Sequence, residues 1–163
     1  MHKFNKVYVD MDGVLCDFNK RFKELYGVTP QGAESRHRFG NYFARFIQSG
    51  EFATLEKMPD TDDLLAYLKT IEVPIEILSS TARPSSNAQI SLQKQKWLDK
   101  HKITYHANFV PGKALKAKYA DENSIIIDDT ESVIDDWKKA GGTGILHKDA
   151  LTTIAILSTL LSV

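Results

Sequence analysis

Four short apolar runs, each closed by small or polar residues, stand out along the chain. Short continuous apolar runs are typical of strands buried on both faces of a sheet. They predict strands at Lys6–Asp10, Pro74–Leu78, about Tyr105–Val110 and Ser124–Ile127. Turn-forming residues follow these runs and mark where each strand ends. The chain is therefore expected to contain four buried strands.

Between these strands, apolar residues recur at the spacing of an α-helix. Leu64, Leu65 and Leu68 share one face of a helix that starts at Asp60-Thr61-Asp62. Further helices are predicted over Asn87–His101, Lys113–Ala120 and Glu131–Ala140, with a terminal helix over Leu151–Val163 packed on the body. Strands that alternate with helices imply right-handed crossovers and a parallel sheet covered on both sides. We therefore predict an α/β fold with a Rossmann-like parallel sheet.

The stretch between the first two predicted strands is unusually long. It spans about sixty residues, far more than one crossover helix requires. Asp17–Tyr26 and the aromatic-rich Phe39–Ile47 are predicted as helices within it. We assign residues 16–56 to a helical cap inserted after the first strand, and residues 1–15 and 57–163 to the core α/β domain. Since ligands of open α/β sheets bind at the carboxyl ends of the strands, the cap is expected to close over that edge.

Composition excludes several function classes. The 163 residues carry 21 Lys+Arg against 21 Asp+Glu, so there is no general attraction for nucleic acid or an anionic membrane. Cys16 is the only cysteine, which rules out an internal disulfide and fits a reducing, cytoplasmic location. No segment has the pattern of a signal peptide or a membrane span. The absence of a glycine-rich phosphate loop argues against a kinase or a dehydrogenase.

Acidic pairs follow two of the predicted strands. Asp10 and Asp12 end the first strand, and Asp128 and Asp129 end the fourth. In a parallel sheet these ends are neighbours or near-neighbours, so several carboxylates are expected within a few ångströms of each other. Such carboxylates repel one another, and a bound divalent cation relieves the repulsion. Ligands that are all oxygen atoms favour Mg²⁺.

The other two strand ends offer groups that suit a phosphate. Ser79-Ser80-Thr81 supplies hydroxyls and amides, and Lys113 supplies a positive charge after the Pro111-Gly112 turn. Each signal is weak alone, because such serines often cap helices and most lysines are solvated. Together, four strand ends carrying Asp-x-Asp, Ser, Lys and Asp-Asp indicate phosphoryl transfer, in which one Asp attacks phosphorus while the metal and a lysine offset charge.

The same residues resemble the four motifs of the haloacid dehalogenase superfamily. These are Asp10-Met11-Asp12-Gly13-Val14, Ser79, a following lysine and Asp128-Asp129. The aromatic cap, Lys96-Trp97-Leu98, Trp137 and Gly141-Gly142 extend the resemblance to the 5′(3′)-deoxyribonucleotidase family, including its phage and bacterial members. The resemblance covers Val7 to about Ile145. It implies a Mg²⁺-dependent phosphatase that acts on deoxyribonucleoside 5′(3′)-monophosphates.

The resemblance also implies roles for individual residues. Asp10 is the nucleophile that becomes an aspartyl-phosphate, and Asp12 protonates the leaving oxygen and then activates water. Asp10, the backbone carbonyl of Asp12 and Asp128 hold Mg²⁺, and Asp129 supports the metal ligands. Ser79 binds the transferring phosphoryl oxygens, with Ser80 beside it. Phe18, with Phe43, is the candidate for stacking against the base, although both rings equally suit the core of the cap.

Which lysine reaches the site is open on spacing alone. The spacing in the animal enzymes of the family selects Lys118, and Lys116 lies between the candidates. We select Lys113, because an α-helix that starts at the active edge carries later residues away from it at about 1.5 Å per residue.

Alternatives remain for substrate and role. The same chemistry could act on another small phosphorylated metabolite or on a polynucleotide 3′-phosphate, and a non-catalytic binding module on the same fold ranks last because Asp10 and Asp12 are both present. A small-molecule nucleotide is the expected partner. The oligomeric state is left open, with a homodimer as one option.

Overall fold

The computed structural model describes residues 3–162, so predicted ranges that include residues 1, 2 or 163 extend outside the described part of the chain. Five parallel strands form one sheet in the order β3-β2-β1-β4-β5. Their bounds are β1 Lys6–Val9, β2 Ile75–Ser80, β3 Ala107–Val110, β4 Ser124–Asp128 and β5 Thr143–Leu146. The parallel sheet confirms the α/β prediction.

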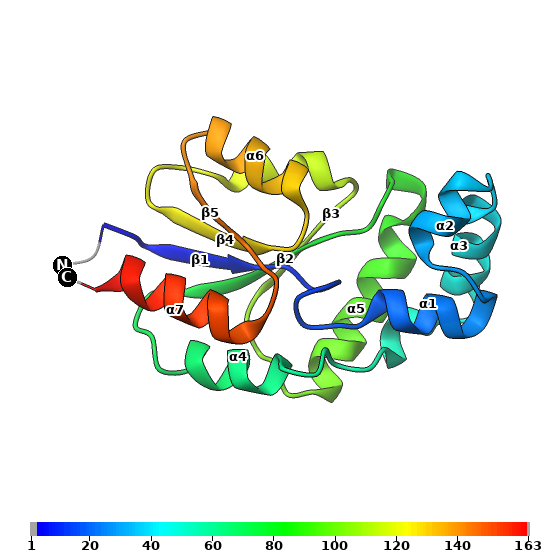
Figure 1. Ribbon diagram of the computed structural model, residues 1–163, viewed down its shortest axis with the longest axis horizontal. Helices are drawn as coiled ribbons and strands as arrows, with labels where there is room; N and C mark the ends of the chain where they lie inside the picture. The colour runs from blue at the N-terminus through cyan, green and yellow to red at the C-terminus, as the bar shows by residue number, and fades with distance from the viewer. Residues whose placement is uncertain (1–2, 163) are drawn as a thin grey trace.

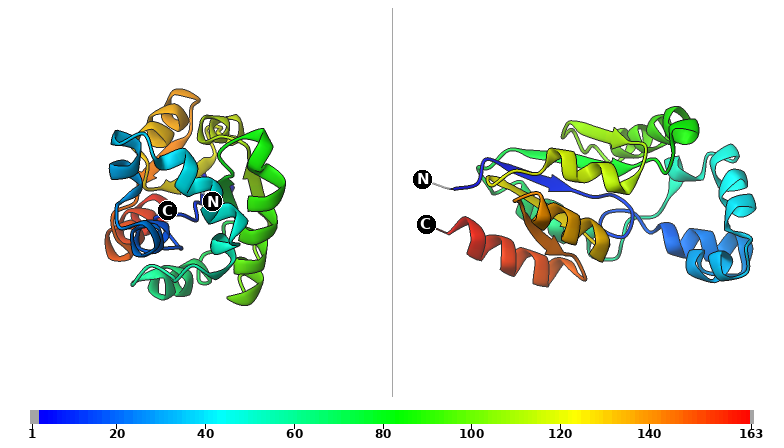
Figure 2. Two further views of the ribbon diagram at one scale, coloured as in Figure 1. Left: turned by 90° about the vertical axis from the view of Figure 1, so that its right-hand side faces the viewer. Right: turned by 90° about the horizontal axis from the view of Figure 1, so that it is seen from above.

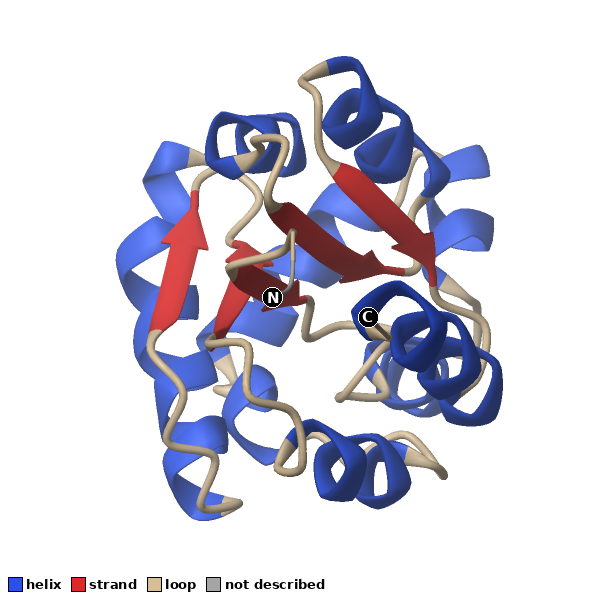
Figure 3. Ribbon diagram, turned by 90° about the vertical axis from the view of Figure 1, so that its left-hand side faces the viewer, coloured by secondary structure: helices blue, strands red, loops and turns tan. Residues whose placement is uncertain are grey.

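Helices cover both faces of the sheet (Figures 1 and 3). One face carries the 3₁₀ helix η3 (Lys113–Tyr119) and α6 (Glu131–Lys139), and the other carries α4 (Thr61–Leu68), α5 (Asn87–Lys100) and α7 (Ala150–Leu161). Successive strand residues enter opposite layers: Ile125 and Ile127 join the larger core, whereas Ile126 joins the smaller one. This double burial explains why the strands are continuous apolar runs.

The segment between β1 and α4 forms α1 (Phe18–Tyr26), α2 (Pro30–Ser35), α3 (Phe39–Gln48) and the 3₁₀ helix η1 (Glu51–Thr54). These helices lie at one end of an elongated molecule, beyond the carboxyl ends of the strands and away from both termini (Figures 1 and 2). Residues 16–56 are called the cap. The short 3₁₀ helix η2 (Pro84–Ser86) leads into α5, which contacts both β3 and η1 and so joins the cap to the sheet.

Four elements were not predicted: β5, α2 and the short 3₁₀ helices η1 and η2. In β5, Gly144 weakens the β-strand pattern, yet a Cβ at this position would lie 3.0 Å from the Ile134 side chain of α6, so glycine favours the close approach of this helix. The start of α2 did carry a sequence signal, namely a threonine followed by a proline, which often cap and begin helices. In the structure Thr29 Oγ1 accepts a hydrogen bond from Gly32 N at 3.0 Å, and Pro30 is the first residue of the helix.

The segment after the third strand differs from its prediction. Lys113–Tyr119 is a 3₁₀ helix rather than two turns of α-helix. Residues three apart share one side of a helix of either kind, so Lys113 and Lys116 lie on the same side of η3. Within residues 3–162, no helix has both the length and the apolar character needed to cross a membrane.

Candidate active site

The site lies where β1, β2 and β4 end. Val9 pairs with Ile77 on one side and with Ile127 on the other. Asp10 follows directly, and its backbone N donates to Ile127 O at 3.0 Å. Because the strands are parallel and adjacent, Asp10 and Asp128 leave the sheet at the same edge, as the spacing of acidic pairs predicted.

A tight loop after β1 turns Asp12 away from Asp10. The carbonyl of Met11 accepts from the backbone N of Val14, Leu15 and Cys16, and Gly13 adopts φ +84°. A Cβ on Gly13 would lie 1.9 Å from Asp129 Oδ2. Glycine is therefore needed here both for the backbone conformation and to let the Asp129 carboxylate approach.

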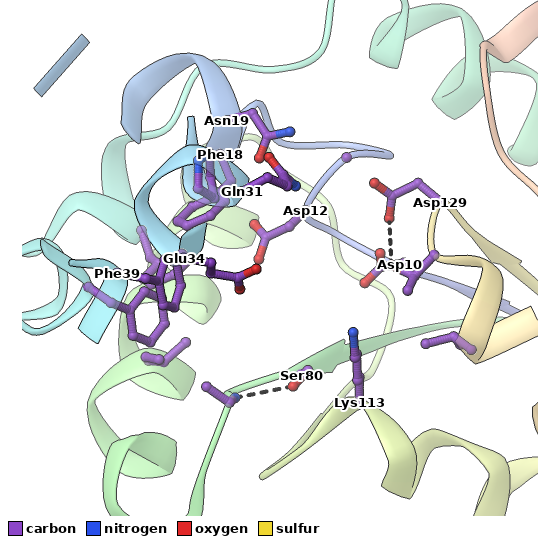
Figure 4. Close-up of a pocket in the computed structure, with 18 of the residues that line it drawn as sticks. Asp10, Asp12, Phe18, Asn19, Gln31, Glu34, Phe39, Ser80, Lys113 and Asp129 are labelled. Carbon is purple, nitrogen blue, oxygen red and sulfur yellow. Dashed lines mark hydrogen bonds between the residues drawn. The ribbon is translucent and has the colours of Figure 1, made fainter. Parts of the chain in front are cut away.

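Asp10, Asp128 and Asp129 form a carboxylate cluster. Each offers an oxygen, and these three oxygens lie within 4.8 Å of one another. Burial and the charge of Asp128 raise the pKa of Asp10, although Lys116 opposes the shift. Desolvation of the Asp129 carboxyl, together with the charges of Asp10 and Asp128, raises the pKa of Asp129 to about 8, and the Asp129 and Asp10 side chains are hydrogen-bonded (Figure 4). The raised pKa values indicate that the protein does not fully neutralise the negative charge of these three carboxyl groups.

Lys116 is the one cation in direct contact with this cluster among the described residues. Its side chain is 3% exposed, and Nζ lies 2.8 Å from Asp10 Oδ1 and 2.7 Å from Asp128 Oδ2. Burial disfavours the ammonium, but the two carboxylates outweigh burial and raise the pKa of Lys116. When all three carboxyl groups are ionised, as they would be around a metal ion, one ammonium leaves two negative charges. A hard divalent cation such as Mg²⁺ fits this charge and this set of oxygen ligands.

A second buried lysine holds Asp12. Lys94 Nζ on α5 lies 2.9 Å from Asp12 Oδ2, 2.7 Å from Ser79 Oγ and 2.9 Å from Ser80 O. It also lies 5.2 Å from the centre of the Phe52 ring of η1. Asp12 therefore belongs to a separate ion pair, and its side chain is outside the cluster of Asp10, Asp128 and Asp129.

A cavity of about 430 Å³ opens over these groups and reaches the cap. Its floor includes Asp10, Asp12, Lys116 and Asp129, and its far wall is formed by rings of the cap, namely Phe18, Phe39, Phe43 and Phe52. Phe18 and Phe52 stack nearly parallel, with ring centroids 5.6 Å apart and an interplanar angle of 2°. Asn19, Gln31 and Glu34 add polar groups to this wall (Figure 4). The cavity thus has a charged end and an aromatic end.

The structure separates the candidate phosphate ligands. Ser80 lines the cavity, whereas Ser79 is fully buried against Lys94. Both residues lie within β2, where successive side chains point to opposite faces. The prediction placed the strand end at Leu78 and so treated both serines as loop residues.

Lys116, rather than Lys113, contacts Asp10. The prediction ranked the lysines by their distance along the helix axis, but residues three apart share one side of a helix, so Lys113 and Lys116 both line the cavity. The lysine farther along is the buried one that reaches Asp10. Lys113 is exposed and Lys118, also exposed, does not line the cavity.

Lys94, Asn19, Gln31 and Glu34 were not predicted as site residues. For Lys94 a signal existed, since it lies on the buried face of its helix between Ile90 and Trp97. A lysine on an apolar face needs a buried partner. The three polar cap residues are exposed on short helices, and nothing in the sequence distinguishes them from surface residues.

No protein-family model and no curated protein matches the chain. Among solved structures, similarity is found to a hydrolase from Streptococcus pneumoniae TIGR4, with 17% identity, TM-score 0.57, and 96% of this chain and 99% of that chain covered. A HAD-superfamily hydrolase from Ehrlichia chaffeensis has 12% identity, TM-score 0.55 and coverages of 99% and 100%. A HAD family hydrolase from Deinococcus radiodurans R1, with bound phosphate and sodium, has 15% identity, TM-score 0.54 and coverages of 96% and 89%. This chain therefore shares the fold of hydrolases of the HAD superfamily.

Proposed function

We propose that the protein is a Mg²⁺-dependent phosphatase that hydrolyses deoxyribonucleoside 5′(3′)-monophosphates. The observation that carries the proposal is a single cavity with Asp10, Asp12 and two lysines at one end and aromatic rings at the other. The bound phosphate in the Deinococcus radiodurans structure of the same fold supports a phosphate ester as substrate.

The reaction takes two steps in this proposal. An Asp10 carboxylate oxygen attacks phosphorus, the bond from phosphorus to the leaving oxygen breaks, and Asp12 gives that oxygen a proton. Water then attacks the phosphorus of the aspartyl-phosphate and transfers a proton to Asp12. Inorganic phosphate leaves, and both carboxyl groups return to their starting states.

The cations of the site bind and orient the phosphate. Lys116 holds Asp10 and, with its third N–H, is free among the described residues to reach a phosphoryl oxygen. Lys113 and the Ser80 hydroxyl stand on the same wall (Figure 4). Asp10, Asp128 and Asp129, with the backbone carbonyl of Asp12, would hold Mg²⁺, which when bound supplies charge neutralisation for the phosphoryl group. Ser79 contributes through Lys94 rather than by lining the cavity.

The nucleotide part of the proposal is supported by the aromatic wall. Cavities of 300–1,000 Å³ typically take small organic ligands, and about 430 Å³ falls in this range. Phe18 and Phe43 offer ring surfaces against which a base can stack. Asn19, Gln31 and Glu34 stand at the same end and offer hydrogen bonds to a base edge.

The test is phosphate release from a substrate panel, with Mg²⁺ and with EDTA. The panel contains 5′- and 3′-deoxyribonucleotides, ribonucleotides, sugar phosphates and a 3′-phosphorylated oligonucleotide. Asp10→Asn is expected to abolish turnover, while the matched change Asp63→Asn, at an exposed position on α4, leaves it unchanged. Turnover by Asp10→Asn would remove the nucleophile from the proposal. If kcat/KM is higher for sugar phosphates or for the oligonucleotide than for deoxyribonucleotides, the better substrate replaces the proposed one. Nucleotide binding without turnover would indicate a binding module.

A further inference from the structure

We propose that Lys94 is a positioning residue that fixes Asp12 so that Oδ1, and not Oδ2, carries the transferred proton. This inference rests on the proposed function, and it concerns a residue on α5, outside the four strand ends that carry the phosphatase chemistry. Lys94 and Asp12 are 82 residues apart in the chain.

The ammonium of Lys94 has no donor left for a substrate. An ammonium group has three N–H donors, and Lys94 Nζ has three acceptors within 2.9 Å, namely Asp12 Oδ2, Ser79 Oγ and Ser80 O. Lys94 also does not line the cavity. Lys116 differs on both counts, since it lines the cavity and has two acceptors among the described residues. The two buried lysines therefore have different tasks: Lys116 faces the phosphate, and Lys94 holds protein groups.

Lys94 is itself held in place. Its side chain is 2% exposed, and the Phe52 ring lies 5.2 Å from Nζ. The preceding residue ties α5 to the cap, because Gln93 Nε2 donates to Ile47 O at 2.8 Å and Gln93 Oε1 accepts from Phe52 N at 3.2 Å. A donor fixed by packing and by neighbouring hydrogen bonds constrains the acceptor that it binds.

The constraint on Asp12 leaves one of its oxygens for chemistry. Oδ2 is occupied by Lys94, whereas Oδ1 is buried and has no hydrogen-bond partner among residues 3–162. A buried polar atom without a hydrogen-bond partner is uncommon. In the proposed reaction the leaving oxygen of the substrate, and then the attacking water, supplies the partner that Asp12 Oδ1 lacks. When Asp12 is protonated for the reaction, Oδ2 still accepts from Lys94 and the proton is on Oδ1. In the first step this proton leaves Oδ1 for the leaving oxygen, and in the second step Oδ1 accepts a proton from the attacking water.

The test compares Lys94→Met with Lys96→Met, which removes the same charge from an exposed position two residues along α5. General acid and base catalysis contributes about 10²–10⁴-fold, so Lys94→Met is expected to lower kcat for a nucleotide by about 10²-fold with little change in KM. With p-nitrophenyl phosphate, whose leaving group needs no proton, formation of the aspartyl-phosphate survives. Lys94→Met is then expected to release one nitrophenolate per site in a burst, followed by slow turnover. Lys96→Met should match the parent.

A double substitution and a crystal structure complete the test. If Lys94 acts through Asp12, Lys94→Met adds no loss of kcat in an Asp12→Asn background. The double variant also leaves no unpaired buried charge at this position. It is therefore expected to fold even if Lys94→Met alone is unstable, and its kcat can still be measured. The crystal structure of Lys94→Met is expected to show Asp12 in a different or a divided rotamer. This readout needs no activity, so it separates failure of the inference from failure of the proposed function.

Three results would overturn the inference. These are an unmoved Asp12 in the Lys94→Met structure, a further large loss of kcat in the double variant, or a raised KM for both substrates without a burst. The last result would assign Lys94 to phosphate binding. Absence of phosphatase activity in the parent would instead overturn the proposed function, and the position of Asp12 would still decide whether Lys94 orients it.

Discussion

Replacement of Lys116 by methionine should destabilise the metal-free protein strongly. Lys116 is 3% exposed and lies between two carboxylates, Asp10 and Asp128, that are themselves nearly fully buried. Methionine keeps the length and most of the volume of the side chain, so the change removes mainly the charge and its hydrogen bonds. The buried carboxylates then repel each other without a counter-charge.

The expected loss of stability follows from the burial of the two ion pairs that Lys116 forms. Removal of one partner from a buried ion pair costs about 3–5 kcal/mol. At about 2–4 °C per kcal/mol for a chain of this size, the melting temperature should fall by about 6–20 °C. The matched change Lys113→Met removes an exposed lysine that forms no salt bridge within residues 3–162, and exposed substitutions usually stay within about 0.5 kcal/mol.

The assay is thermal and urea unfolding in EDTA, followed by circular dichroism. Adding Asp128→Asn to Lys116→Met should recover part of the lost stability, because it removes one of the uncompensated charges. Mg²⁺ should also reduce the difference in melting temperature between the parent and Lys116→Met, because the cation offsets the charge of the carboxylates. An unchanged melting temperature for Lys116→Met in EDTA, or a further loss on adding Asp128→Asn, would refute the charge argument. Equal losses for Lys113→Met and Lys116→Met would do the same.

Three further predictions address pH, the base and its hydrogen bonds. Because the pKa of Asp129 is about 8 in the folded chain against an ordinary value of 3.8, its ionisation disfavours folding increasingly from about pH 4 to pH 8. In EDTA, Asp129→Asn should therefore melt above the parent at pH 9 and near it at pH 4, with a smaller stabilisation by Mg²⁺; a lower melting temperature at pH 9 would contradict this. Phe18→Leu should lower kcat/KM for nucleotides at least about 5-fold, from a stacking energy of about 1–3 kcal/mol per base, and spare p-nitrophenyl phosphate. Glu34→Gln should lower the ratio of kcat/KM for guanine over thymine nucleotides, because a carboxylate only accepts hydrogen bonds whereas an amide also donates them; a ratio unchanged within about 2-fold would exclude Glu34 from base contact.

The sequence by itself determined the parallel sheet and the carboxylate cluster. Both follow from local order along the chain: apolar runs make strands buried on both faces, and residues that directly follow parallel strands meet at one edge. Asp10, Asp128 and Asp129 each lie within two residues of a strand end, so their approach needed no knowledge of side-chain packing. The helical segment after the first strand was likewise predicted from its length.

Only the tertiary structure decided which lysine and which serine face the cavity. The answer for the lysines depends on which side chain of Lys113–Tyr119 is buried toward Asp10, namely Lys116, and the answer for the serines depends on two further residues of strand in β2. Lys94 and Asp12 meet across 82 residues, and Lys116 and Asp10 across 106. Contacts of this kind depend on how α5 and η3 pack against the sheet and on the direction of each side chain, and periodicity along the chain indicates neither.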